Sequence, residues 1–421
     1  MPLFGALRLR SDPTGLAQDL RRAHGDIAFV TVLGRDVVVA QGPAAAAELV
    51  GDRDEAFANE PVYGFALGSL FERGILLMDA DEHRRHRRIL QTAFTRTRLD
   101  GYAQRLHPLV SSAMANFPTG DGVDMRIPLK AIALDLALEI FLGARLPRAD
   151  VDRMNRAFVE LIEAAGALVR LPIPGTRWHR AQQAKTVLDD YMADVVSDRR
   201  RRPGADLMSA LCSADIDGAG RLSDAEIVDH MRFMLFAAHD TATIAMTSMV
   251  YRLGRHRRWR DELRDEAIDL GTRPGLGELR SAVATDAVFR ESVRLRPPVP
   301  VVPRAAIKDT ELCGHLIPAG AFVIVPIGAN HRRPDIWPDP ARFDPGRFIG
   351  ERDRRDHPMA WMPFGGGRHN CMGMHFAYLE SAIVVHHLLE AYDWTVSSDA
   401  YERDDVALTE NVGFLADVRP R

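Results

Sequence analysis

The stretch FGGGRHNCMG at residues 364–373 decides the fold. It places one cysteine, Cys371, on a glycine-rich loop, and an apolar-periodic run typical of a helix follows directly. A thiolate there would face the positive end of that helix and nearby backbone N–H groups, both of which favour ionised sulfur. Gly365, Gly367 and Gly373 would let the loop adopt positive φ and approach a flat ligand closely. The stretch therefore predicts a loop that can hold an iron-bound sulfur under a porphyrin.

Two simpler interpretations of Cys371 stay open at this point. A lone cysteine is most often a buried free thiol. A zinc site is the second alternative, because His369 and His375 are close to Cys371 in the sequence. Zinc sites usually show paired Cys or His at set spacings, and no second cysteine is nearby. The glycines around the cysteine argue against both alternatives.

The loop has the pattern F-G-x-G-x-H-x-C-x-G and resembles the haem-ligand loop of the cytochromes P450. This resemblance implies a mainly α fold with a smaller β part: a triangular prism of helices with haem b between a long central helix and the cysteine loop. It implies Cys371 as the axial ligand of the haem iron. It also implies haem contacts from the loop residues Phe364, Gly365, His369 and Gly373.

Length and composition are ordinary for a globular protein, with 421 residues, 46% hydrophobic and 27% charged. We expect one domain over residues 1–421, since no Pro-rich or Ser/Gly-rich linker divides the chain. The net charge of −4 argues against nucleic-acid binding. Three scattered cysteines favour a reducing cytosol over a disulfide framework. No apolar run is long enough for a membrane anchor, so the resemblance implies a soluble, cytoplasmic, bacterial-type member.

Strand signals are confined to a β-rich portion at about residues 25–45 and 300–327. Residues 27–32 and 37–40 predict an antiparallel hairpin. A second predicted pair joins residues 310–312 to 322–327. The rest is mostly helical.

Two helices matter for the site. Residues 79–82 resemble a capping box that opens a helix running to about Phe94. Residues 226–252 form a long run that is apolar on most faces, which indicates a central buried helix.

A second signal is Glu291-Ser-Val-Arg294, stopped by a double proline. Glu and Arg three apart share one helix face, and alone they would be a surface pair worth about 0.3 kcal/mol. The arrangement resembles the family's E-x-x-R helix behind the haem loop, where a second arginine completes a buried triad. Arg347 matches that position, with Arg342 as the near competitor. Their role would be structural.

A third signal is Ala237-Ala238-His239-Asp240-Thr241 inside the long helix. It resembles the family's A-G-x-(D/E)-T segment, which passes over the iron. The small residues would leave room for dioxygen and substrate, and Asp240 and Thr241 would deliver protons by general acid catalysis. Ala238 stands where glycine is usual. The alternative is a polar interruption with Thr241 bonded back to the Ala237 carbonyl.

A fourth signal is the basic run at residues 83–88. Such a run is usually a solvated helix face, but His83 and Arg87 are four apart and share one side. They resemble the family's H-x-x-x-R pair, which binds the haem propionates; Arg304 and His369 match further propionate positions. Three remaining arginines would face outward and suit an acidic redox partner: Arg84, Arg85 and Arg88.

Together these features predict a haem-thiolate monooxygenase that inserts one oxygen atom from O2 into a lipophilic small molecule, by hydroxylation or epoxidation. Electrons would come from a ferredoxin or flavodoxin with its reductase, and we expect a monomer. Two alternatives remain. A peroxide-fed peroxygenase would usually lack the acid–alcohol pair, and a haem-binding sensor or carrier would lack the oxygen-activating segment. By the resemblance, apolar segments would contact the substrate: 61–74, 159–178, 234–243, 299–302 and the surroundings of Phe414.

Overall fold

The computed structural model describes residues 12–421 except 33, 69, 72, 144–147, 166–169, 172, 354–356, 400 and 402–412. The chain forms two compact units. We call them the sheet unit (residues 1–58, 111–129 and 241–421) and the helical unit (residues 59–110 and 130–240). The fold is mainly helical, as predicted, and the strands lie in the sheet unit. That the whole chain forms a single domain stays a prediction.

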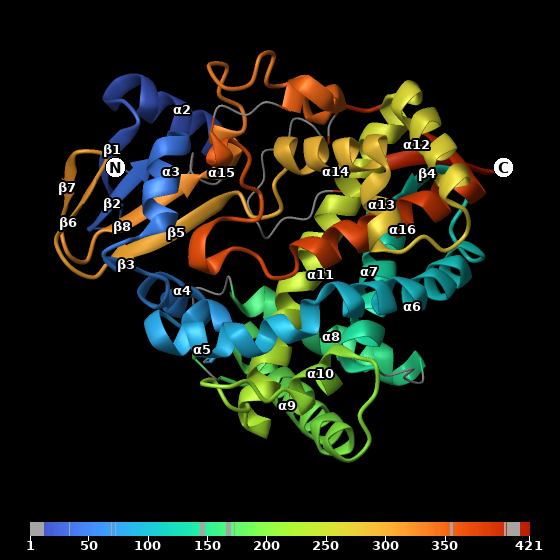
Figure 1. The fold of residues 1–421 in the computed structure, drawn as a ribbon, viewed down its shortest axis with the longest axis horizontal. Helices are drawn as coiled ribbons and strands as arrows, with labels where there is room; N and C mark the ends of the chain where they lie inside the picture. Colours follow the sequence, from blue (N-terminus) through green and yellow to red (C-terminus); the bar gives the residue numbers. More distant parts are fainter. Residues whose placement is uncertain are drawn as a thin grey trace. The chain divides into compact units, whose positions relative to one another are not determined.

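The main sheet has five strands in the order β1-β2-β8-β5-β3 (Figure 1). β1 and β2 form the predicted antiparallel hairpin, with Val30 opposite Val37. β2 then pairs in parallel with β8, and β8 pairs antiparallel with β5. The strand bounds are Ile27–Val32 (β1), Arg35–Ala40 (β2), Phe57–Ala58 (β3), Val301–Ala306 (β5) and Phe322–Pro326 (β8).

The predicted pairing of residues 310–312 with 322–327 is wrong. β6 (Thr310–Leu312) pairs instead with β7 (His315–Ile317). The two residues between them, Cys313 and Gly314, both have positive φ, 49° and 77°, which is the geometry of a tight two-residue hairpin turn. The turn closes the hairpin locally and leaves β8 to join the main sheet.

A second sheet has the order β4-β10-β9 and joins segments far apart in the chain. Its strands are Gly120–Asp124 (β4), Tyr392–Thr395 (β9) and Leu415–Pro420 (β10). Val418 of β10 pairs with Trp394 of β9. The Trp394 indole is buried and donates to the carbonyl of Val250.

The helices of the sheet unit surround these strands and carry the cysteine loop (Figure 1). α14 and α16 are buried along most of their length; α16 is apolar on most faces, whereas α14 buries the charged Glu291 and Arg294 among its apolar residues. The α-helices are α2 (Pro13–His24), α3 (Gly42–Gly51), α12 (Arg257–Leu270), α13 (Leu276–Ser281), α14 (Val283–Leu295), α15 (Ile327–Asn330) and α16 (Met374–Ala391). Short 3₁₀ helices follow α15: η3 (Pro345–Phe348), η4 (Gly350–Asp353), η5 (Pro358–Ala360) and η6 (Gly367–His369).

The helical unit is built mainly from packed helices. Its members are α4 (Glu60–Leu67), η1 (Ile75–Leu77), α5 (Ala80–Leu90), η2 (Gln91–Phe94), α8 (Arg148–Ala165), α9 (Arg177–Arg201) and α10 (Leu207–Ser213). Three further helices have residues in both units: α6 (Arg96–Met114), α7 (Arg126–Leu142) and α11 (Asp224–Arg255). α11 is the predicted long helix. Within the described residues, no helix is long and apolar enough to cross a membrane.

The predicted capping box at residues 79–82 is wrong, although the helix itself is present as α5. Asp79 makes no side-chain cap bond to α5. Its carboxylate accepts instead from the backbone N–H groups of Asn59 and Glu60, at 3.0 and 2.9 Å. Asp79 thus serves the start of α4, where the first backbone N–H groups of a helix need acceptors from outside it.

Candidate functional site

The cysteine loop is closed by its own backbone. The Cys371 N–H donates to the Phe364 carbonyl at 2.9 Å. Gly365 and Gly367 have φ of +69° and +64°, as predicted, whereas Gly373 has a φ of −82° and caps α16 instead. A Cβ on Gly367 would lie 1.9 Å from the Val50 carbonyl oxygen, so the loop packs directly on α3. Only glycine fits there.

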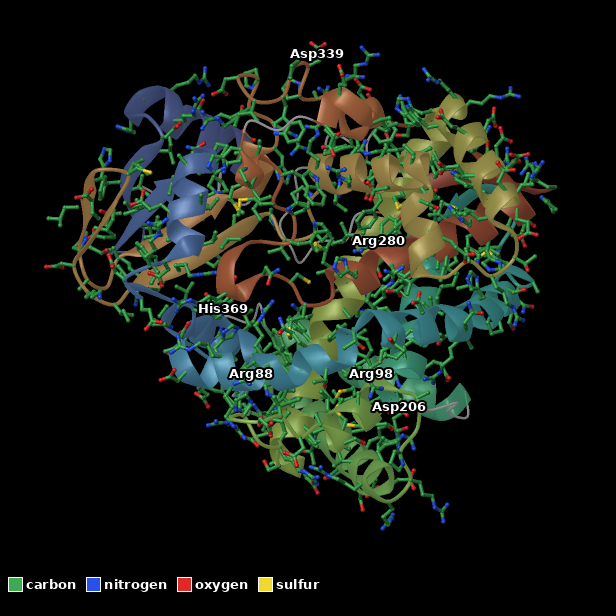
Figure 2. The ribbon with its side chains drawn as sticks, viewed as in Figure 1. Arg88, Arg98, Asp206, Arg280, Asp339 and His369 are labelled. Carbon is green, nitrogen blue, oxygen red and sulfur yellow. The ribbon has the colours of Figure 1, made fainter. Side chains whose placement is uncertain are left out.

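The loop presents Cys371 as an exposed free thiol near the first turn of α16. A haem iron needs one such protein ligand, and the thiol offers it. His369 is half-buried on the loop and is labelled in Figure 2. Over the described part of the chain, no group of three or more His, Cys, Asp or Glu could hold a metal ion. The His375 side chain contacts the Arg280 guanidinium. The donor set therefore fits a haem iron and does not fit zinc.

Glu291 and Arg294 form a buried ion pair behind this loop. Both side chains are 0% exposed, and the guanidinium binds both carboxylate oxygens, at 2.6 and 2.8 Å. Arg294 also donates to the carbonyls of His331 and Pro340. A buried pair with this many bonds is a structural clamp, in contrast to the weak surface pair that spacing alone would suggest.

The second arginine of this cluster is Arg347, the residue chosen from the sequence. Its Nε lies 3.4 Å from a Glu291 oxygen, and its Nη2 donates to the Asp339 carbonyl. Arg342, the other candidate for this position, has an exposed side chain that lines a cavity at the start of α12.

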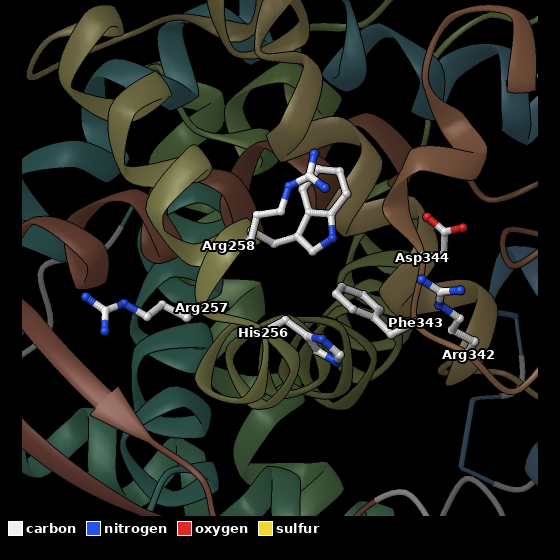
Figure 3. Close-up of a pocket in the computed structure, with 7 residues that line it drawn as sticks. His256, Arg257, Arg258, Arg342, Phe343 and Asp344 are labelled. Atoms are coloured by element: carbon white, nitrogen blue, oxygen red, sulfur yellow. The ribbon is translucent and has the colours of Figure 1, made fainter.

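That cavity has a volume of about 430 Å³ and lies where α12 begins (Figure 3). None of the residues chosen for the site lines it; its walls are His256, Arg257, Arg258, Trp259, Arg342, Phe343 and Asp344.

His331 links the clamp to the cysteine loop, and sequence reasoning missed it. Its Nε2 accepts from the Met362 N–H at 3.0 Å, so Nδ1 carries the proton and donates to the Arg294 carbonyl at 3.1 Å. Full burial lowers the pKa of His331 to about 3 and keeps it neutral. A lone histidine carries no pattern that would have identified this role.

Arg290 fixes the segment that leads into the loop, and it too was missed. Its guanidinium lies 4.3 Å from the Phe348 ring centre and 5.4 Å from that of Trp361. It binds both oxygens of Asp353 at about 3 Å. Its carbonyl accepts from the Trp361 indole N–H at 3.1 Å. The partners are 58 to 71 residues away, so local spacing could not reveal them.

In the helical unit, the predicted acid side chain of α11 has a specific cationic partner. Asp240 Oδ1 accepts from Lys130 Nζ at 3.0 Å and lies 3.3 Å from Nδ1 of His239. His239 is buried, and this lowers its pKa to about 4. Ala237 and Ala238 are small, half-buried residues of α11. Thr241 lies on the same helix, which continues through this segment without a break. Sequence reasoning did not find Lys130.

The predicted propionate ligands are divided between the two units. His83 is buried and Arg87 half-buried on α5 of the helical unit. Arg304 is 6% exposed on β5 of the sheet unit, where its Nη1 donates to the Pro303 carbonyl. That these side chains bind the haem carboxylates stays a prediction.

The expectation that three arginines of α5 face outward together is only partly right. Arg84 is exposed and pairs with Asp81. Arg88, labelled in Figure 2, is exposed as well and donates to the Asp217 carbonyl. Arg85 is instead half-buried and donates to the carbonyls of Ala219 and Arg221. The turn at residues 217–221 offers free backbone acceptors, and arginines with several donors satisfy them.

Most of the apolar segments expected to contact substrate are described, except residues 69, 72, 166–169 and 172, which lie outside the described residues. Met234, Val302 and Phe414 are each less than 10% exposed.

Comparisons with known proteins agree with this geometry. The Cytochrome P450 family model matches residues 1–415. A Mycobacterium tuberculosis protein described as cytochrome P450 136 is 37% identical over 414 residues, covering 96% of this chain and 83% of the relative. The cyclooctat-9-en-7-ol 5-monooxygenase of Streptomyces melanosporofaciens is 28% identical, covering 86% of this chain and 81% of that enzyme.

A solved structure has the same fold. The retinoic acid-bound cyanobacterial CYP120A1 superposes with a TM-score of 0.85 at 26% identity, covering 98% of this chain and 95% of that one. The mainly α fold with small sheets is thereby confirmed. With a family model that matches nearly the whole sequence, the chain belongs to the cytochrome P450 family of haem b monooxygenases.

Proposed function

We propose that Cys371 is the axial thiolate ligand of haem b in an enzyme that hydroxylates or epoxidises a lipophilic small molecule. One observation carries this proposal. Cys371 is exposed on a loop that its own backbone bond to Phe364 and the close contact of Gly367 with α3 hold rigidly. When bound, the haem supplies the activation of O2 and the oxidising power.

The chain's own residues supply position, charge and protons. The Glu291–Arg294 clamp, with Arg347 beside it, binds the backbone carbonyls of His331 and Pro340, and His331 in turn accepts from the Met362 N–H just before the cysteine loop. His83, Arg87, Arg304 and His369 would neutralise the haem carboxylates, which need donors when they are dehydrated.

On α11, the Asp240 carboxyl would take up a proton from solvent, and the Thr241 hydroxyl would donate a proton for the O2 chemistry that the haem supplies when bound. The half-buried Ala237 and Ala238 would leave the space that O2 and substrate need. This acid–alcohol pair favours an O2-dependent monooxygenase over a peroxide-fed enzyme or a sensor.

We infer an isoprenoid-like substrate class, because two relatives act on or bind such molecules by their names. The Streptomyces relative is a cyclooctat-9-en-7-ol monooxygenase, and the cyanobacterial structure holds retinoic acid. Both compounds are mostly hydrocarbon with few oxygens. A library of cyclic terpenoids, polyene acids, steroids and fatty acids would be screened for the low-spin to high-spin shift that substrate causes when it displaces water from the iron. A response only to fatty acids would contradict this inference.

We further propose that an acidic ferredoxin or flavodoxin supplies the electrons, and that the enzyme is a cytoplasmic monomer. Arg84 and Arg88 are exposed on α5 and suit an acidic partner. Three free cysteines suit a reducing compartment. Rates of reduction that do not change with ionic strength would contradict the first proposal, and a dimer in sedimentation would contradict the monomer.

The decisive experiment adds carbon monoxide to the reduced protein. A strongly red-shifted Soret band is expected from thiolate ligation, and Cys371→Ser should abolish it. Cys313→Ser is the matched control, because Cys313 is also an exposed free thiol but lies in the β6–β7 turn. A histidine-type spectrum in the wild type, or a red-shifted band that survives in Cys371→Ser, would contradict the proposal. Thr241→Ala should divert electrons from product to peroxide.

A further inference from the structure

Lys130 of α7 reaches the acid side chain of α11 across 110 residues of sequence. Its ammonium donates to Asp240 Oδ1 at 3.0 Å, and both residues belong to the helical unit. The side chains are 29% and 23% exposed, so solvent reaches the pair. Lysine is rare in this chain, with arginine filling nearly all other basic positions. A lysine holds a carboxylate through a flexible stem and a point charge, which can release more readily than a two-pronged guanidinium.

The opposite neighbour of this carboxylate carries no charge at neutral pH. His239 Nδ1 lies 3.3 Å from the same Oδ1, and burial lowers the pKa of this imidazole to about 4. Of the groups that face Asp240 in these contacts, Lys130 from α7 is therefore the cation, and His239 from its own helix is neutral. The ammonium is thus a charged partner that holds Oδ1 of this carboxylate.

We infer that Lys130 is a positioning residue that holds the Asp240 carboxylate by Oδ1. This inference rests on the proposed function, in which Asp240 takes up protons from solvent. Lys130 thus fixes where the carboxylate waits between proton transfers, and the partial exposure of the pair gives water access to the carboxylate.

Two variants test this inference, with a matched control. Lys130→Met removes the charge and keeps the length of the stem, whereas Lys130→Arg keeps the charge. Lys185→Met is the control, since Lys185 pairs with Asp189 at 3.1 Å with similar exposure, 20% and 26%, in the same unit. All variants should keep the red-shifted carbon monoxide band, which reports an intact haem–thiolate bond.

Product formed per electron consumed should fall about fivefold in Lys130→Met, the factor that corresponds to the upper range for a partly exposed ion pair. Peroxide should rise in parallel. Lys130→Arg should recover most of the wild-type coupling, and Lys185→Met should match the wild type.

A second readout does not depend on turnover. In urea unfolding, Lys130→Met should shift the midpoint less in an Asp240→Asn background than in the wild type, because the ion pair is already lost there. Equal shifts of the urea midpoint in both backgrounds would overturn the inference. It would also be overturned if Lys130→Met formed as much product per electron as Lys185→Met, or if Lys130→Arg lost as much coupling as Lys130→Met.

Failure of the proposed function looks different, since the wild type itself would then lack the red-shifted band. If Lys130→Met is the one variant that loses that band, Lys130→Gln is measured instead, with the same expected and contradicting results. If Lys130→Gln also loses the band, the comparison of urea midpoints with and without Asp240→Asn tests the inference.

Discussion

Glu380 is a buried carboxyl group whose replacement should stabilise the protein. It lies in the middle of α16 with 1% of its surface exposed, and its Oε1 has no hydrogen-bond partner among the described residues. Burial raises the pKa of Glu380 from 4.5 to about 8. The folded protein therefore keeps a proton at neutral pH that the unfolded chain releases. Stability from this group is complete below about pH 4.5 and falls as the pH rises toward 8.

The size of the effect follows from that difference. Each pH unit above 4.5 costs about 1.4 kcal/mol until the folded carboxyl also ionises, so the loss is about 3 kcal/mol at pH 7 and approaches about 5 kcal/mol above pH 8. Glutamine has nearly the same shape and never ionises. Glu380→Gln should therefore match the wild type near pH 4.5 and exceed its free energy of unfolding by about 3 kcal/mol at pH 7.

Urea unfolding of the haem-loaded protein at pH 5.5 and 8.5 measures this directly. The advantage of Glu380→Gln over the wild type should grow by about 3 kcal/mol between the two pH values. Glu390→Gln is the control, because Glu390 is exposed on the same helix, and it should leave the pH dependence unchanged. An equal advantage at both pH values, or a destabilised glutamine variant at pH 8.5, would refute the reasoning that Glu380 is neutral when folded.

Three further changes test the scaffold of the cysteine loop. Gly367→Ala should lower the melting temperature and the haem content, because the new Cβ would meet the Val50 carbonyl at a φ of +64°; Gly350→Ala, at a φ of +58° with open space, should leave the haem content unchanged. Arg290→Met should cost about 2–3 kcal/mol in urea unfolding by removing both bonds to the half-buried Asp353 carboxylate, and an unchanged midpoint would count against the role of Arg290 in fixing this segment. Because the pKa of His331 is lowered in the folded protein, the imidazole gains a proton below pH 6.5 in the unfolded chain but not in the folded one. The free energy of unfolding should therefore fall by about 2 kcal/mol between neutral pH and pH 5. His331→Asn should reduce this loss of stability at acid pH.

What the sequence predicted best is what its near neighbours determine. The cysteine loop is a run of ten residues, and its glycines at 365 and 367 do adopt positive φ. Gly373 does not, because it serves as the cap of α16. The β1–β2 hairpin was equally predictable, since both strands and their turn are contiguous. The pairing of β6 was not, because the tight turn at Cys313 offered a nearer partner than β8.

Long-range partners set the limit of what could be predicted. Spacing placed Glu291 and Arg294 on one face, but only the packed fold shows that both are fully buried and bonded to carbonyls about 40 residues away. Arg290, His331 and Lys130 had no local signature at all. Each owes its role to a contact 31 or more residues distant in the chain. A single sequence does not encode such pairs in its periodicity or spacing.

The residues behind Cys371 and the Asp240–Lys130 pair differ in burial and in number of bonds, and this difference matches the roles proposed for them. The groups behind Cys371 are fully buried, and each makes several bonds, as the fork of Arg294 and the two bonds of His331 show. Breaking any of them would leave a buried charge or donor unpaired, so this loop is held rigidly. Asp240 and Lys130 are instead about a quarter exposed and joined by one bond. Such a pair opens at little cost. An axial ligand must stay in place through every turnover, whereas an acid that takes protons from solvent must move, and the structure gives each the kind of contact that its task requires.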